Sequence, residues 1–389
     1  MRFLVEKIFK KIKNQKSKVK SQKSKVKKIM LKILHIESSL GWGGQEHRTL
    51  KEMREMRNRG HCVELLTRPG AKLAERAAAE NFTTHAVKMR GGADLIAVWQ
   101  MLKIIKSNDY DVVNTHSGHD SLLGGLAGRL ARKPLVVRTR HLALAITSLA
   151  TYKWLPHKVV TVSEWVEKYL VSVGVPAENV KTIYTGIEAA PKVENPTLRK
   201  ELNLADDDIL SVTVAILRYE KGHKSLIDAA IPLFAKYPKL HLVFAGDGPI
   251  FEELKNYIAE LNLSERIHLL GLRKDIPNVL QSCDFFTLPT WQEALGTSFI
   301  EAMNSGLAVI GSAVDGVPEV IQDGKNGLLI EAKNEKSIQT ALERLITDVD
   351  LRKQMGKVGK EITQTKFSVA KMAEEMESFY IQSIQERNK

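Results

Sequence analysis

Short apolar runs alternate with helical patterns along almost the whole chain. In the first half the strand-like runs are 32–36, 62–67, 111–115, 135–139 and 158–162, and in the second half they are 209–215, 241–245, 267–270, 285–288 and 308–310. Between them, apolar residues recur with a helical period, as in 46–59 and 93–107. Strands that alternate with helices in this way predict a parallel sheet with crossover helices in each half.

The two predicted sheets are separated by the segment 189–196, which has two prolines and no periodicity. We therefore predict an α/β protein of two Rossmann-like, doubly wound domains, 30–190 and 191–366. Ligands of such sheets bind at the carboxyl ends of the strands, which predicts a site in a cleft between the domains. A final amphipathic pattern predicts a C-terminal helix within 367–389, and its apolar positions are Phe367, Val369, Met372, Met376, Phe379 and Tyr380.

The segment 293–301, Glu-Ala-Leu-Gly-Thr-Ser-Phe-Ile-Glu, carries two carboxylates separated by seven residues. A helix is predicted to begin near Thr297, and eight helical steps would separate the two acids by roughly 12 Å along the axis. The paired carboxylates of a glycosidase lie closer, about 5 to 10 Å apart. The two acids are therefore predicted to hold different ends of one elongated ligand, with an anion bound at the helix start between them. That description fits a nucleoside diphosphate sugar.

The loop 41–45, Gly-Trp-Gly-Gly-Gln, follows the first predicted strand and opens a helix. Gly43 and Gly44 would let the backbone approach a ligand closely, and a helix start favours phosphate. The spacing is not G-x-G-x-x-G, so it does not indicate a dinucleotide site. A simple tight turn accounts for the same glycines equally well.

Polar residues also end two strands of the first half. His116 follows the run 111–115, and Arg140 and His141 belong to the polar cluster 138–141. Strand ends of this kind face the ligand in doubly wound sheets. A lone histidine is more often structural, and a solvated loop is the alternative for the cluster. Cationic groups there could meet an anionic acceptor or a diphosphate, so Arg140 and His141 are candidate acceptor contacts.

Four blocks in order resemble the retaining GT-B glycosyltransferases of family 4, also called group 1. They are Phe-Ala-Gly-Asp-Gly-Pro at 244–249, Leu-Gly at 270–271, the E-x7-E segment at 293–301, and the run 316–329 that begins Gly-Val-Pro-Glu-Val-Ile. The likeness covers about Lys32 to Tyr380. It implies the GT-B architecture, in which the C-terminal helix crosses back to the first domain.

The resemblance implies a catalytic role for four residues, His116, Arg218, Lys221 and Glu293. His116 matches the histidine beside the donor sugar, and Glu293 would face the sugar hydroxyls. Lys221 would hold the diphosphate of the donor. When the chain is aligned on Lys221, the family's usual arginine position holds Ile216, and Arg218 lies two residues later as a substitute.

Donor binding is expected of a second group of residues. Glu301 would accept hydrogen bonds from the ribose hydroxyls, and the Gly296 and Thr297 amides would lie near the diphosphate. The loop around Arg273 resembles the part of the family that contacts the base through its backbone. The full set of predicted donor contacts is Gly43, Gly44, Gly246, Arg273, Leu295, Gly296, Thr297 and Glu301.

The implied reaction is transfer of a sugar from a nucleotide-sugar donor to an acceptor hydroxyl, in enzyme class EC 2.4, with retention of configuration. The resemblance implies front-face displacement with a leaving-group phosphate oxygen as the base, and the sequence itself shows no dedicated base. The family-level expectation is bacterial surface polysaccharide, lipopolysaccharide or glycolipid synthesis. The rival hypotheses are a nucleotide-sugar epimerase and a non-catalytic nucleotide-sugar-binding protein of the same fold.

The 389 residues carry a net charge of +13, but the charge is uneven. Residues 1–29 hold 12 Lys/Arg and one acid, which leaves +2 for the other 360 residues. Nucleic acid is therefore not an expected partner of the folded body. The basic extension 1–29 is interpreted either as a non-functional extension or misplaced start, or as a tether to an anionic membrane surface. Its apolar helical face would comprise Phe3, Leu4, Ile8, Phe9 and Ile12.

The chain has two cysteines, Cys62 and Cys283, which make neither a disulfide framework nor a metal site. Buried thiols in a reducing compartment are predicted, so the expected location is cytoplasmic, with possible peripheral contact at the inner face of the plasma membrane. No run is long enough for a transmembrane helix. No cluster of His, Asp and Glu has the spacing of a metal site, so neither a cofactor nor a metal is expected.

Overall fold

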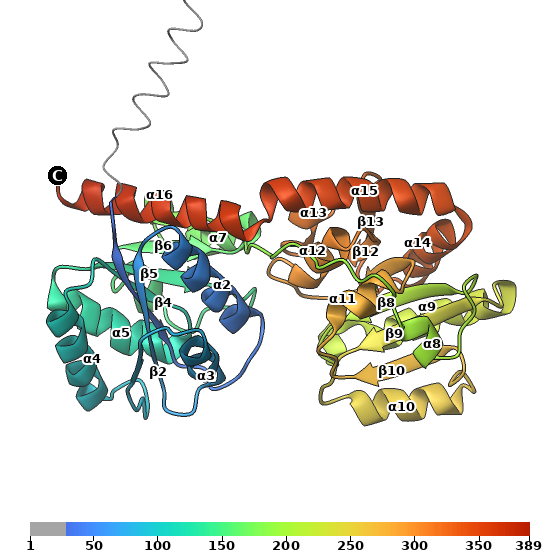
Figure 1. Cartoon of the computed structure of the whole chain (residues 1–389), viewed down its shortest axis with the longest axis horizontal. Helices are drawn as coiled ribbons and strands as arrows, with labels where there is room; N and C mark the ends of the chain where they lie inside the picture. The colour runs from blue at the N-terminus through green and yellow to red at the C-terminus, as the bar shows by residue number, and fades with distance from the viewer. Residues whose placement is uncertain (1–28) are drawn as a thin grey trace, which may run out of the picture. The chain divides into compact units, whose positions relative to one another are not determined.

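Two parallel sheets organise residues 29–389, the part of the chain that the computed structural model describes (Figure 1). The expectations for the basic extension, including its apolar helical face, concern residues that lie outside this range, apart from Ile29. Residues 32–389 form one compact unit. The prediction of two Rossmann-like α/β domains is confirmed.

The first sheet has seven strands in the order β3-β2-β1-β4-β5-β6-β7. All of its pairings are parallel, and β1 lies between β2 and β4 with Ile33 opposite both Val63 and Val112. The strands are β1 (Lys32–Glu37), β2 (Cys62–Thr67), β3 (Thr84–Ala86), β4 (Val112–Thr115), β5 (Leu135–Arg140), β6 (Lys158–Thr161) and β7 (Val180–Thr182).

The second sheet has six strands in the order β10-β9-β8-β11-β12-β13, again all parallel. They are β8 (Ile209–Val214), β9 (Leu240–Ala245), β10 (Ile267–Gly271), β11 (Phe285–Leu288), β12 (Ala308–Ser312) and β13 (Gly327–Ile330). In each sheet the strand order reverses once, between β1 and β4 and between β8 and β11. These are the topological switch points at which such sheets bind ligands.

The helices lie between the strands, as the alternating pattern predicts. In the first half they are α2 (Gly44–Asn58), α3 (Lys72–Ala79), α4 (Leu95–Asn108), α5 (Gly118–Ala131), α6 (Ala150–Lys153) and α7 (Glu164–Ser172), with a 3-10 turn η1 (Ala177–Asn179). In the second half they are α8 (Leu198–Glu201), η2 (Tyr219–Lys221), α9 (His223–Lys236), α10 (Phe251–Glu260), α11 (Ile276–Gln281), α12 (Thr297–Asn304), α13 (Val317–Val320), α14 (Glu335–Thr347) and α15 (Val349–Lys366).

The last helix, α16 (Val369–Arg387), packs on the N-terminal half of the chain (Figure 1). Its Tyr380 hydroxyl donates to Glu52 of α2 at 3.0 Å, and Glu377 accepts from Arg59 just after α2. At the far end, Arg387 donates to the carbonyl of Pro134 at 2.6 Å. Buried apolar residues of the helix, such as Met376, fill the space beneath it.

The chain crosses between its halves at two places that lie side by side. One is the stretch after β7, where Ile187 donates its N–H to the Phe367 carbonyl at 2.8 Å. The other is the junction of α15 and α16, where Val369 returns a hydrogen bond to the Ile187 carbonyl at 3.1 Å. A Cβ on Gly186 would lie 2.6 Å from the Val369 Cα, so this position accepts only glycine without movement.

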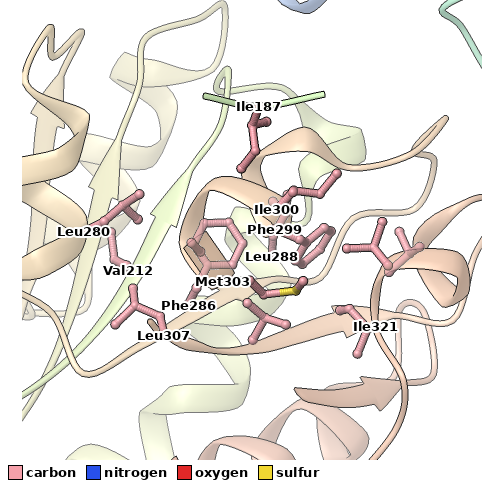
Figure 2. Close-up of a cluster of buried hydrophobic side chains, with 14 of the residues drawn as sticks. Ile187, Val212, Leu280, Phe286, Leu288, Phe299, Ile300, Met303, Leu307 and Ile321 are labelled. Carbon is pink, nitrogen blue, oxygen red and sulfur yellow. The ribbon is translucent and has the colours of Figure 1, made fainter. Parts of the chain in front are cut away.

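Apolar side chains of β11, α12 and the neighbouring strands form the core of the second half (Figure 2). Phe286 and Phe299 meet edge to face at 5.3 Å in its centre. Ile187, from the crossing segment, belongs to the same cluster, which therefore joins the crossing to the core.

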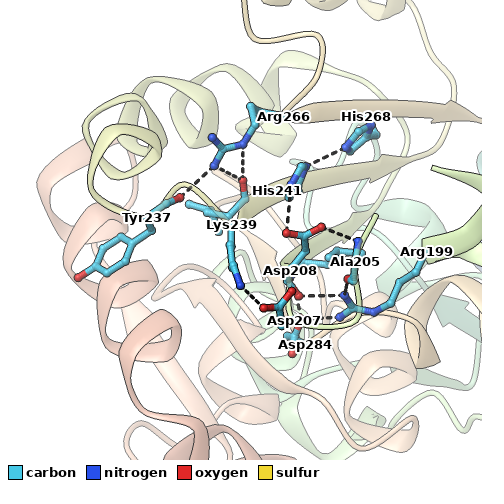
Figure 3. Close-up of polar contacts among 12 residues, drawn as sticks. Arg199, Ala205, Asp207, Asp208, Tyr237, Lys239, His241, Arg266, His268 and Asp284 are labelled. Carbon is cyan, nitrogen blue, oxygen red and sulfur yellow. Dashed lines mark hydrogen bonds and ion pairs between the residues drawn. The ribbon is translucent and has the colours of Figure 1, made fainter. Parts of the chain in front are cut away.

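Charged residues gather at the amino ends of β8 and β9, opposite the carboxyl ends where the switch point lies (Figure 3). Arg199 donates to Asp284 at 2.9 Å, and Asp284 accepts from the Leu210 N–H at 2.9 Å. His241 and His268 meet here at 3.1 Å. These side chains therefore pair with one another, and the Arg199–Asp284 pair holds α8 against the sheet.

Candidate functional site

Lys221 and Glu293 meet at the switch point of the second sheet. Lys221 ends the turn that follows β8, and Glu293 lies in the loop that follows β11. The Lys221 Nζ donates to Glu293 Oε2 at 2.6 Å, and the two side chains are 16% and 20% exposed. The Glu293 N–H donates in turn to Asp315 at 2.9 Å. The loop is thus held so that a cation and a carboxylate face the same small volume.

The start of α12 follows this pair directly. Gly296 is the residue before the helix, and its φ of +88° is the left-handed conformation that favours glycine. Within the described part of the chain no side chain caps the first turn at Thr297, and Leu295 before it is buried. An uncapped helix start offers backbone N–H groups to an anion.

Glu301 lies one turn further along α12 and is half-buried. Its carboxylate makes no hydrogen bond or ion pair within the described part of the chain. Burial raises the pKa of Glu301, and the attraction of Lys51 on α2 lowers it in part.

Gly246 borders the same region from β9. It has a φ of +155°, and a Cβ at this position would lie 1.9 Å from the Ala215 carbonyl oxygen after β8. A side chain here would push apart the two loops that follow these strands.

The two predicted arginines of the second half lie in different surroundings. Arg218 is 53% exposed, and its nearest charged partner is Glu220 at 3.9 Å, so it is free to reach a ligand. Arg273 is engaged with Asp275 at 2.8 and 2.7 Å and with Glu201 at 2.8 Å. The guanidinium of Arg273 could contact the donor only in competition with these carboxylates. The backbone of Arg273 does not take part in these ion pairs, so a donor contact through the backbone involves no such competition.

His116 follows β4 at the switch point of the first sheet, and it is buried between two other histidines. Its Nε2 lies 3.0 Å from His35 Nδ1 on β1, and its Nδ1 lies 3.1 Å from His141 Nε2 after β5. Burial holds the pKa of His116 well below its usual range, and the neighbouring His35, His141 and Arg48 lower it further. Both ring nitrogens of His116 therefore already have partners in the protein.

The glycine-rich loop opens α2 beside the same switch point. The Gly43 N–H donates to Glu46 at 2.8 Å, and Gly44 is the first residue of the helix. A Cβ at Gly44 would meet nothing within 4 Å, so space for a ligand remains there.

A buried carboxylate pair, Glu37 and Asp120, lies under this loop. Glu37 accepts from Gln45 at 2.5 Å, from the Ser39 N–H at 2.9 Å and from the Ser117 hydroxyl. Burial, followed by repulsion from Asp120, raises the pKa of Glu37 to about 8. Such a shift marks a position where a proton is held near neutral pH.

Arg140 shapes the loop that follows β5. Its guanidinium donates to the Leu142 carbonyl at 2.9 Å, to the Tyr152 hydroxyl at 2.7 Å and to the Leu144 carbonyl. His141 beside it is half-buried. Of the two candidate acceptor contacts, His141 is the one whose side chain still has an atom without a partner among the described residues.

Several residues of this region were missed in the sequence. His35 and Glu37 are two residues apart on β1, and the two-residue period of a strand puts both on the same face of the sheet. Glu52 and Arg48 are buried one turn apart on α2. That spacing puts them on one helix face, but no local signal shows that the face is buried under α16.

No group of three or more His, Cys, Asp or Glu among residues 29–389 is arranged to hold a metal ion. No helix in this range is long and apolar enough to cross a bilayer. Cys283 is buried, as predicted, whereas Cys62 is only half-buried because it begins β2 at the edge of the packed region. Burial raises the pKa of both thiols.

Two family descriptions match this chain, one on each half. The model for Glycosyltransferase Family 4 matches residues 42–190, and the model for Glycosyl transferases group 1 matches residues 194–362. The boundary between the two matches, at 190–194, lies after β7, and together they cover every strand of both sheets except β1.

The chain is similar to proteins of known activity and structure. It is 27% identical to the UDP-Gal:alpha-D-GlcNAc-diphosphoundecaprenol alpha-1,3-galactosyltransferase of Escherichia coli. The aligned region of 378 residues covers 91% of this chain and 97% of that protein. It is 26% identical over 207 residues to the N-acetyl-alpha-D-glucosaminyl L-malate synthase of Bacillus anthracis, 53% of this chain and 54% of that protein. The crystal structure of Anabaena Alr3699/HepE in complex with UDP has the same fold, with a TM-score of 0.81 at 21% identity over 90% of this chain and 100% of that one.

Proposed function

Because this chain belongs to the group 1 and family 4 glycosyltransferases with the GT-B fold, we propose that it moves a sugar from a nucleoside diphosphate donor to an acceptor hydroxyl with retention of configuration. The donor lies against the second sheet, with its diphosphate at the start of α12 and its ribose on Glu301. The sugar extends toward Glu293 and the first sheet.

The observation that carries this proposal is the Lys221–Glu293 pair at 2.6 Å beside the uncapped start of α12. Negative charge develops on the diphosphate as the glycosidic bond breaks. A fixed cation and preorganised N–H groups stabilise that charge without later rearrangement. Glu293 accepts from Lys221 in the absence of donor, and in the complex it accepts from sugar hydroxyls.

The proton of the acceptor hydroxyl passes to an oxygen of the departing phosphate on the same face of the sugar. Bond making and breaking on one face preserves the anomeric configuration. Lys221 and Arg218 supply positive charge to the diphosphate, so we propose that turnover needs no metal. Undiminished turnover in excess EDTA is the expected result.

For the donor we propose UDP-galactose. For the acceptor we propose an α-GlcNAc residue that is joined to a lipid through a diphosphate, as in the Escherichia coli relative. The solved neighbour's complex with UDP supports a uridine donor. With an acceptor of this kind, the proposed site of action is the inner face of the cytoplasmic membrane, and the proposed pathway is surface polysaccharide or lipopolysaccharide synthesis.

The test has two steps. A thermal-shift screen across UDP, GDP, ADP and their sugars identifies the donor, with UDP and UDP-galactose expected to give the largest rise in melting temperature. The purified protein is then incubated with UDP-galactose and an α-GlcNAc-diphospholipid, and the new anomeric centre is read by NMR. A β-linked product would overturn the retaining mechanism.

The same incubation separates the rival hypotheses. An epimerase converts the donor sugar when no acceptor is present. A non-catalytic protein binds UDP in the thermal-shift screen but gives no product with any donor. Transfer that requires the acceptor is the outcome that our proposal predicts.

A further inference from the structure

Three imidazole rings form a continuous hydrogen-bonded row across the first sheet. His35 Nδ1 and His116 Nε2 are 3.0 Å apart, and His116 Nδ1 and His141 Nε2 are 3.1 Å apart. The rings are stacked or tilted, with centroids 5.2 and 5.3 Å apart. The row runs from the buried His35 on β1, through the buried His116 after β4, to the half-buried His141 after β5.

A neutral imidazole has one N–H and one lone pair, so the protons in such a row must all point the same way. If His116 donates through Nε2, its Nδ1 must accept from His141. If it donates through Nδ1, its Nε2 must accept from His35. Thr49 lies 3.5 Å from His116 Nδ1, but its hydroxyl proton already goes to the Gln45 carbonyl at 3.0 Å. The direction is therefore set at the ends of the row.

The inner end of the row faces an acceptor oxygen. His35 Nε2 lies 3.8 Å from Glu52 Oε1, an ion-pair distance longer than a hydrogen bond. The same oxygen accepts from the Tyr380 hydroxyl at 3.0 Å, and Tyr380 in turn accepts from Asn114 at 3.0 Å. A carboxylate that only accepts favours an N–H on His35 Nε2 over a lone pair there.

The outer end of the row is open. His141 Nδ1 makes no hydrogen bond among the described residues, although its partner nitrogen is engaged with His116. Burial and the positive charges of Arg48, Arg140 and Arg138 hold the pKa of His141 well below its usual range, which keeps the ring neutral. With the protons directed toward Glu52, His141 Nδ1 presents a lone pair.

We propose that this histidine row fixes His141 Nδ1 as an acceptor for the hydrogen bond of a substrate hydroxyl, with His116 and His35 as positioning residues. The inference rests on the proposed function for the identity of the substrate. A lone pair binds the O–H of a sugar and repels a carboxylate or phosphate. The part of the acceptor that meets His141 is therefore a neutral hydroxyl, in contrast to the anionic group that the cluster 138–141 suggests from its charge.

The first experiment reads the protons directly in the ligand-free, full-length chain. With ¹⁵N-labelled histidine, long-range ¹H–¹⁵N spectra distinguish the two tautomers of each ring. We expect an Nε2–H on His35, His116 and His141. An Nδ1–H on His116 or His141 would overturn the proposal, whatever the protein transfers.

The second experiment tests the positioning role with two variants of one residue. His35→Leu removes the acceptor for the His116 N–H, and because a buried N–H without an acceptor is costly, we expect the Nδ1–H tautomer to predominate at His141. With UDP-galactose and an α-GlcNAc-diphospholipid, the acceptor KM should rise about three- to tenfold, the effect of one neutral hydrogen bond, while kcat changes less than about twofold. His35→Asn retains an amide oxygen for His116 and should restore both readouts.

The control uses the histidine pair of the second half, His241 and His268, which meet at the same distance of 3.1 Å (Figure 3). His268→Leu should change neither the His141 tautomer nor the acceptor KM. Equal KM effects in His35→Leu and His35→Asn with unchanged tautomers would overturn the positioning role. Absence of transfer by the unmodified enzyme would refute the proposed substrates, and the tautomer measurement would still decide the direction of the row.

Discussion

At the scale of single residues, Glu301 differs from the other acids of the site because its carboxylate has no hydrogen-bond or ion-pair partner among residues 29–389. We predict that Glu301→Ala weakens binding of the nucleotide donor about tenfold to a hundredfold. A charged hydrogen bond contributes about 1.5 to 3 kcal/mol. Titration calorimetry with UDP measures the change, and Glu361→Ala, an exposed acid of α15, is the matched control. An unchanged dissociation constant would remove Glu301 from the donor site.

Lys221 is predicted to act on the transition state more than on the bound donor. We expect Lys221→Ala to reduce kcat by more than about tenfold while donor affinity falls less, because charge on the diphosphate grows as the bond breaks. Lys236→Ala is the control, since Lys236 makes an ion pair of the same 2.6 Å length with Glu343 in an exposed position. A loss of affinity with normal kcat would argue against this role.

Glu37 is predicted to make stability depend on pH. The pKa of Glu37 is about 8 in the folded protein, and the usual value for a glutamate is 4.5. Between these two pH values the folded protein keeps a proton that the unfolded chain releases. Stability should therefore fall as pH rises from about 4.5 to 8, by at most about 1.4 kcal/mol per unit. Urea unfolding at pH 5 and pH 8 measures the slope, and Glu37→Gln should flatten it. Equal slopes in both proteins would contradict the assignment.

The sequence led to the second half of the site more fully than to the first. Glu293, Gly296 and Lys221 lie in ordered local motifs, so their placement follows from the strands and turns beside them. The partners of His116 come from β1, β5 and α2, which are distant in the sequence. Pairing of parallel strands brings them together, and no local pattern shows which side chains will meet.

At the scale of elements, hydrophobic periodicity predicts ten of the strands and helices such as 46–59 and 93–107, which correspond to α2 and α4. The three strands that were missed, β3, β7 and β13, are all edge strands with one neighbour. β3 and β7 are three residues long and partly exposed, so their apolar pattern is weak, whereas β13 is largely buried but only four residues long. The sequence predicts a helix that begins near Thr297, and α12 begins at this residue, directly after Gly296.

The crossing between the halves depends on Gly186. We predict that Gly186→Ala destabilises the protein by about 1 to 3 kcal/mol, because the added methyl group would lie 2.6 to 2.8 Å from the backbone of Ser368 and Val369. Urea unfolding measures the loss. Gly91→Ala is the control, since its methyl group would meet nothing within 4 Å. Equal stability of the two variants would show that the crossing can shift.

At the scale of the whole molecule, we predict that deletion of residues 1–29 leaves the melting temperature and activity unchanged. The segment carries a net charge of +11 and few apolar residues, so it adds little to a core. If it is a membrane tether, its loss reduces binding to anionic vesicles, and that binding weakens with salt. A large fall in melting temperature would show that the extension is structural. Equal vesicle binding by both proteins would exclude the tether.

The return of α16 to the first half has a consequence for biosynthesis. Tyr380 is joined to Glu52 across 328 positions of the chain. At about 5 to 20 residues per second, a ribosome makes the partner on the order of tens of seconds after α2 has emerged. During that interval Glu52 on α2 lacks the Tyr380 hydroxyl from which it accepts in the folded protein. The first half can therefore complete its packing only after the last helix has been synthesised. A chaperone that binds the face of α2 that carries Glu52 would protect the nascent chain during this interval.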